Sequence, residues 1–86
     1  MVIKAITTDS FRDDVLKTRK PVLVKFWAPW CGYCRALAPA LESIEKQYES
    51  LLSVGRVNFD TETALVRRYN IHALPTLLLF INGAVA

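Results

Sequence analysis

Two successive patterns constrain the fold of this chain more than any other feature of the sequence. Residues 22–27 form a nearly continuous apolar run of β-branched and aromatic side chains, which is typical of a strand covered on both faces. Shortly afterwards Leu37, Leu41, Ile44 and Tyr48 recur at spacings of four, three and four residues, which is one stripe of an amphipathic helix. A buried strand leading into a long helix predicts a layered α/β fold.

The rest of the chain continues this alternation. Strands are predicted over residues 2–6, 54–59 and 76–81, and helices over residues 11–16, after N-cap oxygens at Asp9 and Ser10, and over residues 61–69. Pro39 is expected to kink the long helix without ending it. Asn82-Gly83 indicates a hairpin turn, which leaves only residues 84–86 for a returning strand. We expect one domain over residues 1–86, with a mixed sheet.

Charge and hydropathy exclude several classes of function. The net charge of +3 comes from scattered Lys and Arg with acidic residues between them, so no nucleic-acid partner is predicted. The longest apolar run, residues 77–81, is too short to span a bilayer, so no membrane partner is predicted. The first residues also lack the pattern of a signal peptide, and we therefore expect a cytoplasmic protein.

The chemistry of the chain is predicted at its two cysteines. Cys31 and Cys34 stand directly after a strand and at the start of a helix. The partial positive charge of a helix N-terminus favours the thiolate, which makes Cys31 the expected nucleophile. Cys34 lies one turn deeper on the same helical face, where it can resolve a mixed disulfide. The pattern predicts thiol–disulfide exchange by a redox-active disulfide without a bound cofactor.

The cysteines and two other residues, His72 and Asp60, allow further interpretations. Cys31 and Cys34 could hold a metal or form a structural disulfide, but a structural zinc site needs four ligands, and the chain has two Cys and one His. A disulfide that closes so short a loop would stabilise the fold little. No metal site is therefore predicted. His72 could act as a base but is expected to be an exposed loop residue, and Asp60 is expected to cap the following helix.

The segment FWAPWCGYC at residues 26–34, together with Leu74-Pro75-Thr76, resembles the thioredoxin family, and the similarity extends from Asp9 to Gly83. The resemblance implies a three-layer sandwich that reduces protein disulfides and is recharged by a thioredoxin-reductase-type electron donor. It also implies a cis Pro75 packed against the disulfide, and a Leu74 backbone that binds the substrate chain. The expected docking surface for target proteins consists of Trp30, Gly32, Ala73, Leu74 and Pro75.

The sequence departs from the family in three places. Tyr33 replaces the usual proline, and Gly32-Tyr33 is similar to the dipeptide of disulfide isomerases. Lys25 replaces a buried aspartate, and Arg56 is expected to add a second positive charge that tunes the pair. The chain is also expected to lack the family's last strand and C-terminal helix, which predicts an uncovered sheet face and a homodimer. A disulfide oxidase or isomerase, and a non-catalytic interaction module, are the alternative functions.

Overall fold

The sheet of this protein has five strands in the order β1-β3-β2-β4-β5. The computed structural model describes residues 3–86. Strands β1, β3 and β2 are parallel, whereas β4 is antiparallel to β2, and β5 is antiparallel to β4. The predicted mixed sheet is therefore confirmed. The strands are β1 (Lys4–Ala5), β2 (Val22–Trp27), β3 (Ser53–Asn58), β4 (Thr76–Ile81) and β5 (Ala84–Val85).

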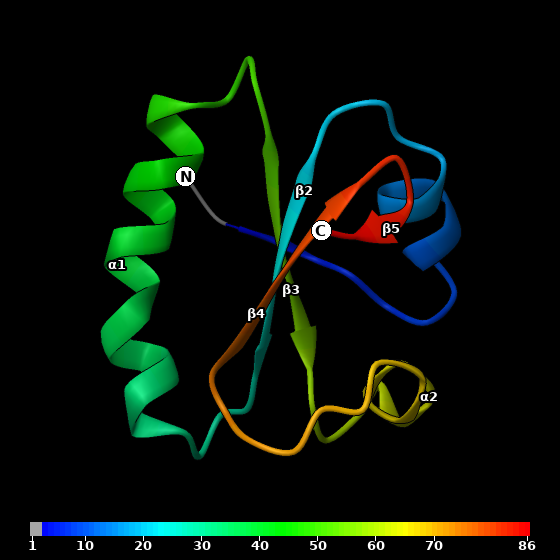
Figure 1. The fold of residues 1–86 in the computed structure, drawn as a ribbon. Coiled ribbons are helices and arrows are strands. Elements are labelled where there is room, and N and C mark those ends of the chain that lie inside the picture. Colours follow the sequence, from blue (N-terminus) through cyan, green and yellow to red (C-terminus); the bar gives the residue numbers. More distant parts are fainter. Residues whose placement is uncertain (1–2) are drawn as a thin grey trace.

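Helices lie on both faces of the sheet (Figure 1). The long helix α1 (Gly32–Gln47) lies on one face and continues through Pro39, as predicted. A π-helical turn, η1 (Arg12–Leu16), and the short helix α2 (Thr63–Arg68) lie on the other face. The three-layer sandwich is confirmed.

The alternation of β2 distributes its side chains between two cores. Val22, Val24 and Phe26 pack with the residues of η1 and α2, where the rings of Phe11, Tyr69 and Phe80 lie 5.2–5.6 Å apart. Leu23 packs on the other face, with a cluster that includes Leu41 of α1. Because alternate residues of a strand share a face, Lys25 and Trp27 also lie on the side of α1. This places a cation beneath the helix that carries the cysteines.

Three expectations about the ends of elements need correction. The last strand is present, because Ala84 and Val85 pair with Ile81 and Phe80. The predicted turn joins these strands, with positive φ angles of 53° at Asn82 and 81° at Gly83. Ser10 does not cap the first helix, because its hydroxyl accepts a hydrogen bond from Thr7 N instead. Of the strand predicted over residues 2–6, residues 4–5 form β1, and residue 2 lies outside the described residues.

Glu62 joins the N-terminal segment to the start of α2. Its carboxylate accepts hydrogen bonds from the Thr61 hydroxyl at 2.7 Å and from Thr8 N at 2.8 Å. These hydrogen bonds, that of Thr61 foremost, lower the pKa of Glu62. The carboxylate therefore stabilises the fold above the ordinary glutamate pKa, and this contribution is lost as the pH falls through the lowered pKa.

Glu62→Gln is expected to lower the free energy of unfolding by about 1 kcal/mol at neutral pH, since it weakens these charge-assisted hydrogen bonds. Urea denaturation at several pH values measures this effect. The difference between wild type and variant should shrink as the pH falls below the ordinary glutamate pKa. Glu49→Gln, at an exposed position, is the matched control. An equal effect of both substitutions would contradict the assignment.

Candidate functional site

The two cysteines form a disulfide at the N-terminus of α1. Cys31 is the N-cap residue, with an extended backbone (φ −88°, ψ 105°), and its Sγ accepts a hydrogen bond from Cys34 N at 3.1 Å. This donor and the helix dipole both stabilise negative charge on Cys31 Sγ after reduction. The geometry agrees with the predicted role of Cys31 as the nucleophile.

The two sulfur-bearing residues differ in burial. Cys31 is 6% exposed and Cys34 is 1% exposed, and both pack in one cluster with Ala28. A target disulfide can therefore reach Cys31 more easily than Cys34. Cys34 is therefore shielded from other proteins, and its expected reaction is the attack on the mixed disulfide at Cys31.

The loop before β4 packs against the disulfide. Leu74 contacts the cluster of Ala28 and the two cysteines, and the Leu74–Pro75 peptide bond is cis, as the resemblance implied. The Thr76 hydroxyl donates a hydrogen bond to the carbonyl of Ala73, which fixes the other end of this loop. The loop thus places the half-buried Leu74 beside the cysteines.

Two large aromatic side chains lie exposed around the disulfide. Trp30 is 64% exposed and Tyr33 is 80% exposed, and Gly32 between the cysteines is open to solvent. The Trp30 indole Nε1 donates to the two carboxylate oxygens of Asp60 at 3.0 and 3.2 Å. The prediction that Asp60 caps α2 is wrong, because the N-cap residue is Glu62 and it makes no side-chain cap. Asp60 instead fixes the orientation of Trp30.

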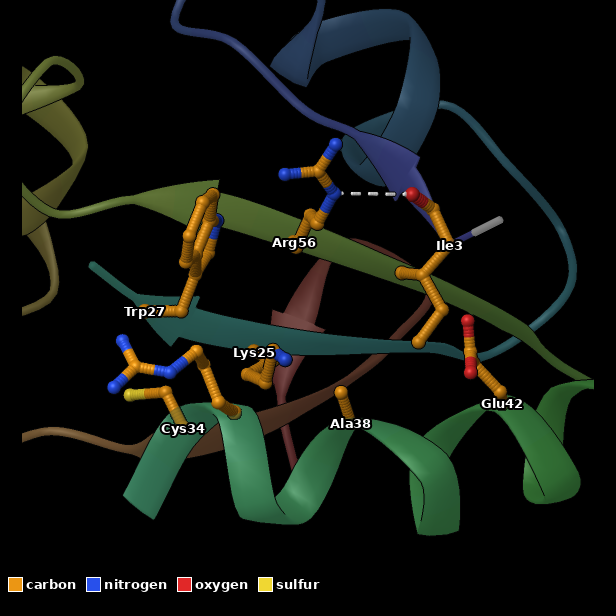
Figure 2. A pocket seen from close by; sticks show the side chains of 8 residues that line it. Ile3, Lys25, Trp27, Cys34, Ala38, Glu42 and Arg56 are labelled. Carbon is orange, nitrogen blue, oxygen red and sulfur yellow. Dashed lines mark hydrogen bonds between the residues drawn. The ribbon is translucent and has the colours of Figure 1, made fainter. Parts of the chain in front are cut away.

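Lys25 lines a cavity of about 190 Å³ between the sheet and α1 (Figure 2). The Lys25 side chain is only 5% exposed. Arg56, its register neighbour on β3, donates from Nε to the carbonyl of Ile3 at 3.2 Å and lies over the Trp27 ring at 5.1 Å. Burial, followed by the Arg56 charge, lowers the pKa of Lys25, and the Glu42 carboxylate opposes this shift. The cavity is lined by Ile3, Lys25, Trp27, Cys34, Arg35, Ala38, Glu42 and Arg56.

The charged residues of this cavity that the sequence did not indicate are Arg35 and Glu42. Cys34, Ala38 and Glu42 follow one another at intervals of four residues, so they lie on one face of α1. Extending the helical stripe from Cys34 would have revealed Glu42. Arg35 also donates a hydrogen bond to the carbonyl of Pro29, which ties α1 to the loop before it.

His72 is exposed in the loop before β4, as expected. Among residues 3–86, no group of three or more His, Cys, Asp or Glu side chains is arranged to hold a metal ion. None of the helices in this range is long and apolar enough to cross a membrane.

Comparison with known proteins agrees with this geometry. The family model described as thioredoxin matches residues 2–86. The chain is 42% identical over 83 residues to a thioredoxin of Griffithsia pacifica, covering 96% of this chain and 76% of that protein. It is 43% identical over 82 residues to thioredoxin 1 of Synechococcus elongatus, covering 95% of this chain and 77% of the relative.

A thioredoxin of Acidithiobacillus ferridurans is 49% identical to the chain over 78 residues, which cover 91% of this chain and 72% of the relative. The matches thus include the strand–helix junction with the cysteines as well as the sheet around it. The chain therefore belongs to the thioredoxin family and is a thiol–disulfide oxidoreductase with Cys31 and Cys34 as its redox-active pair.

Proposed function

We propose that this protein reduces disulfides of other proteins. The Cys31 thiolate attacks one sulfur of the target disulfide, and the other target sulfur leaves as a thiolate. Cys34, as a thiolate, then attacks Cys31 Sγ and releases the second target sulfur. Two electrons have passed to the target, and Cys31 and Cys34 are left as a disulfide. The observation that carries this proposal is Cys31 Sγ, held as a hydrogen-bond acceptor at the N-terminus of α1.

Target proteins dock on the surface around Cys31 in this proposal. The Trp30 indole offers an exposed apolar face whose orientation Asp60 fixes, and the loop of Ala73, Leu74 and Pro75 offers backbone groups for a bound chain. An extended target segment can lie between them, since apolar contacts and backbone hydrogen bonds together bind a peptide without demanding one sequence. These residues confer broad rather than narrow recognition.

A thioredoxin-reductase-type electron donor returns Cys31 and Cys34 to the dithiol. The protein needs no further cofactor in this scheme, because the disulfide itself carries the two electrons. In this proposal the protein takes part in electron transport and redox homeostasis in the cytoplasm, where thiols are kept reduced.

An insulin reduction assay with dithiothreitol as electron donor tests the proposed function. Wild type is expected to accelerate precipitation of the insulin B chain, and the potential of the pair, measured against glutathione, should lie below that of the glutathione pool. Acceleration that requires both cysteines supports the reductase. A potential well above that of the glutathione pool would instead favour the oxidase alternative.

A second copy of this chain is proposed to cover the exposed face of β4. Leu77 pairs with Lys25, so Leu77 and, by the alternation of the strand, Ile81 lie on the α1 side of the sheet. They are nevertheless 42% and 43% exposed. A contiguous apolar face of this kind is rarely left open to water. Sedimentation velocity at micromolar concentrations is expected to show a dimer, and Leu77→Lys should shift it to the monomer. A wild type that stays monomeric and binds no hydrophobic dye would contradict this proposal.

A further inference from the structure

Lys25 is a buried cation without a partner in the part of the chain that the structure describes. It is the one charged side chain that is buried among residues 3–86. Within the same residues, the lysine amines that donate hydrogen bonds belong to Lys4 and Lys20, and the one ion pair joins Lys4 to Asp14. Lys25 Nζ is not sealed from solvent, because it opens into the cavity that Lys25 lines. Lys25 Nζ is therefore available to a ligand that enters the cavity.

The cavity around Lys25 combines apolar walls with positive charge. Arg56 uses Nε for the carbonyl of Ile3, which leaves its other guanidinium N–H groups for further contacts. The acidic residue of the lining, Glu42, lies at the end of the cavity opposite Cys34, with Lys25 between them (Figure 2). The apolar walls come from Ile3, Trp27, Cys34 and Ala38.

The size of the cavity limits its ligand to a small molecule. Its volume of about 190 Å³ is slightly larger than an apolar cavity of about 150 Å³ that holds one benzene molecule. Inorganic phosphate carries tightly bound water that the apolar walls could not replace. A ligand with one charged end and an apolar body matches both the Lys25 amine and the walls.

We propose that this cavity is a binding site for a small carboxylate with an apolar body. The carboxylate accepts hydrogen bonds from Lys25 Nζ and Arg56, and the apolar body lies against Trp27 and Ile3. This site is distinct from the surface on which target proteins dock.

Titration of the oxidised protein with benzoate tests the proposal, and the result does not depend on reductase activity. Two-dimensional NMR should show saturable shifts at the Trp27 indole and along the stripe of Cys34 and Ala38, at millimolar concentrations. Lys25→Met should weaken binding at least tenfold, since it removes the charge but keeps a long, unbranched side chain. Lys25→Arg should retain binding, and Lys46→Met, at an exposed position of α1, should leave it unchanged.

Two ligand controls separate the charge from the apolar body. Benzamide, which has the same ring without the charge, should bind at least tenfold more weakly than benzoate, and inorganic phosphate should not saturate the site. The proposal is overturned if benzamide binds as tightly as benzoate, if Lys25→Met binds benzoate like wild type, or if benzoate shows no saturation. Stronger binding of phosphate than of benzoate would equally refute the carboxylate assignment. Thermal unfolding of each variant verifies that it is folded.

Discussion

Cys34→Ser is expected to accumulate a covalent mixed disulfide with target proteins, whereas Cys31→Ser should form none. In the first variant Cys31 still attacks from the N-terminus of α1, but no second sulfur remains to release the target. In the second variant the remaining thiol of Cys34 is almost fully buried. Multiple turnover of insulin should fall to the uncatalysed rate in both variants.

Non-reducing electrophoresis and mass spectrometry of the trapped species measure this difference. Each reduced variant is mixed with an oxidised target, and peptide mapping identifies the sulfur that carries the adduct. The double variant, with both cysteines replaced by serine, is the control for nonspecific adducts. An adduct on Cys34 in the Cys31→Ser variant, with none on Cys31 in the other, would reverse the assigned roles.

Replacing Lys25 with Asp is expected to raise the pKa of Cys31 and to lower the reduction potential of the pair. A positive charge at Lys25 stabilises the thiolate and hence the reduced form, so its loss disfavours the reduced form. At roughly 6 Å and an effective dielectric constant near 20, one charge is worth about 3 kcal/mol, or roughly two pKa units. The loss of the positive charge alone therefore corresponds to a change of up to about 60 mV in the potential.

Lys25→Met separates the loss of the cation from the gain of an anion. Its effect should have the same direction as that of Lys25→Asp but a smaller size, because methionine removes the positive charge without adding a negative one. Thiolate absorbance as a function of pH gives the pKa of Cys31, and equilibrium with glutathione gives the potential. Unchanged values of both in Lys25→Asp would exclude an electrostatic role for Lys25.

Local patterns predicted most of the elements and the position of the cysteines, because each depends on neighbours in the sequence. The junction of β2 and α1 follows from a strand pattern, a helical stripe and the residues between them. The cis bond at Pro75 had to come from family resemblance, since only about 5–6% of bonds before proline are cis in folded proteins. Composition and periodicity contain no signal that identifies such a bond.

The errors arose where a side chain has a partner far away in the sequence. Asp60 precedes a helix and so resembles a cap, but its carboxylate accepts from Trp30, on the loop before α1. The uncovered sheet face that the sequence predicts, by contrast, agrees with the structure, because Leu77 and Ile81 of β4 are exposed. Apolar side chains show that a strand can be buried, but only the three-dimensional arrangement shows which face a helix covers.

The placement of β2 between β3 and β4 also determines the order in which thiol reactivity and target recognition arise during synthesis. The cysteines lie three residues apart, so they can be oxidised as soon as residues 31–34 leave the ribosome. The Leu74–Pro75 loop reaches them only once β4 has paired with β2, a contact that closes a long loop and is therefore slow. A nascent or partly unfolded chain can therefore already react through its thiols. It lacks the docking loop that distinguishes one target protein from another. On heating, discrimination between target proteins should disappear before the cysteines cease to react.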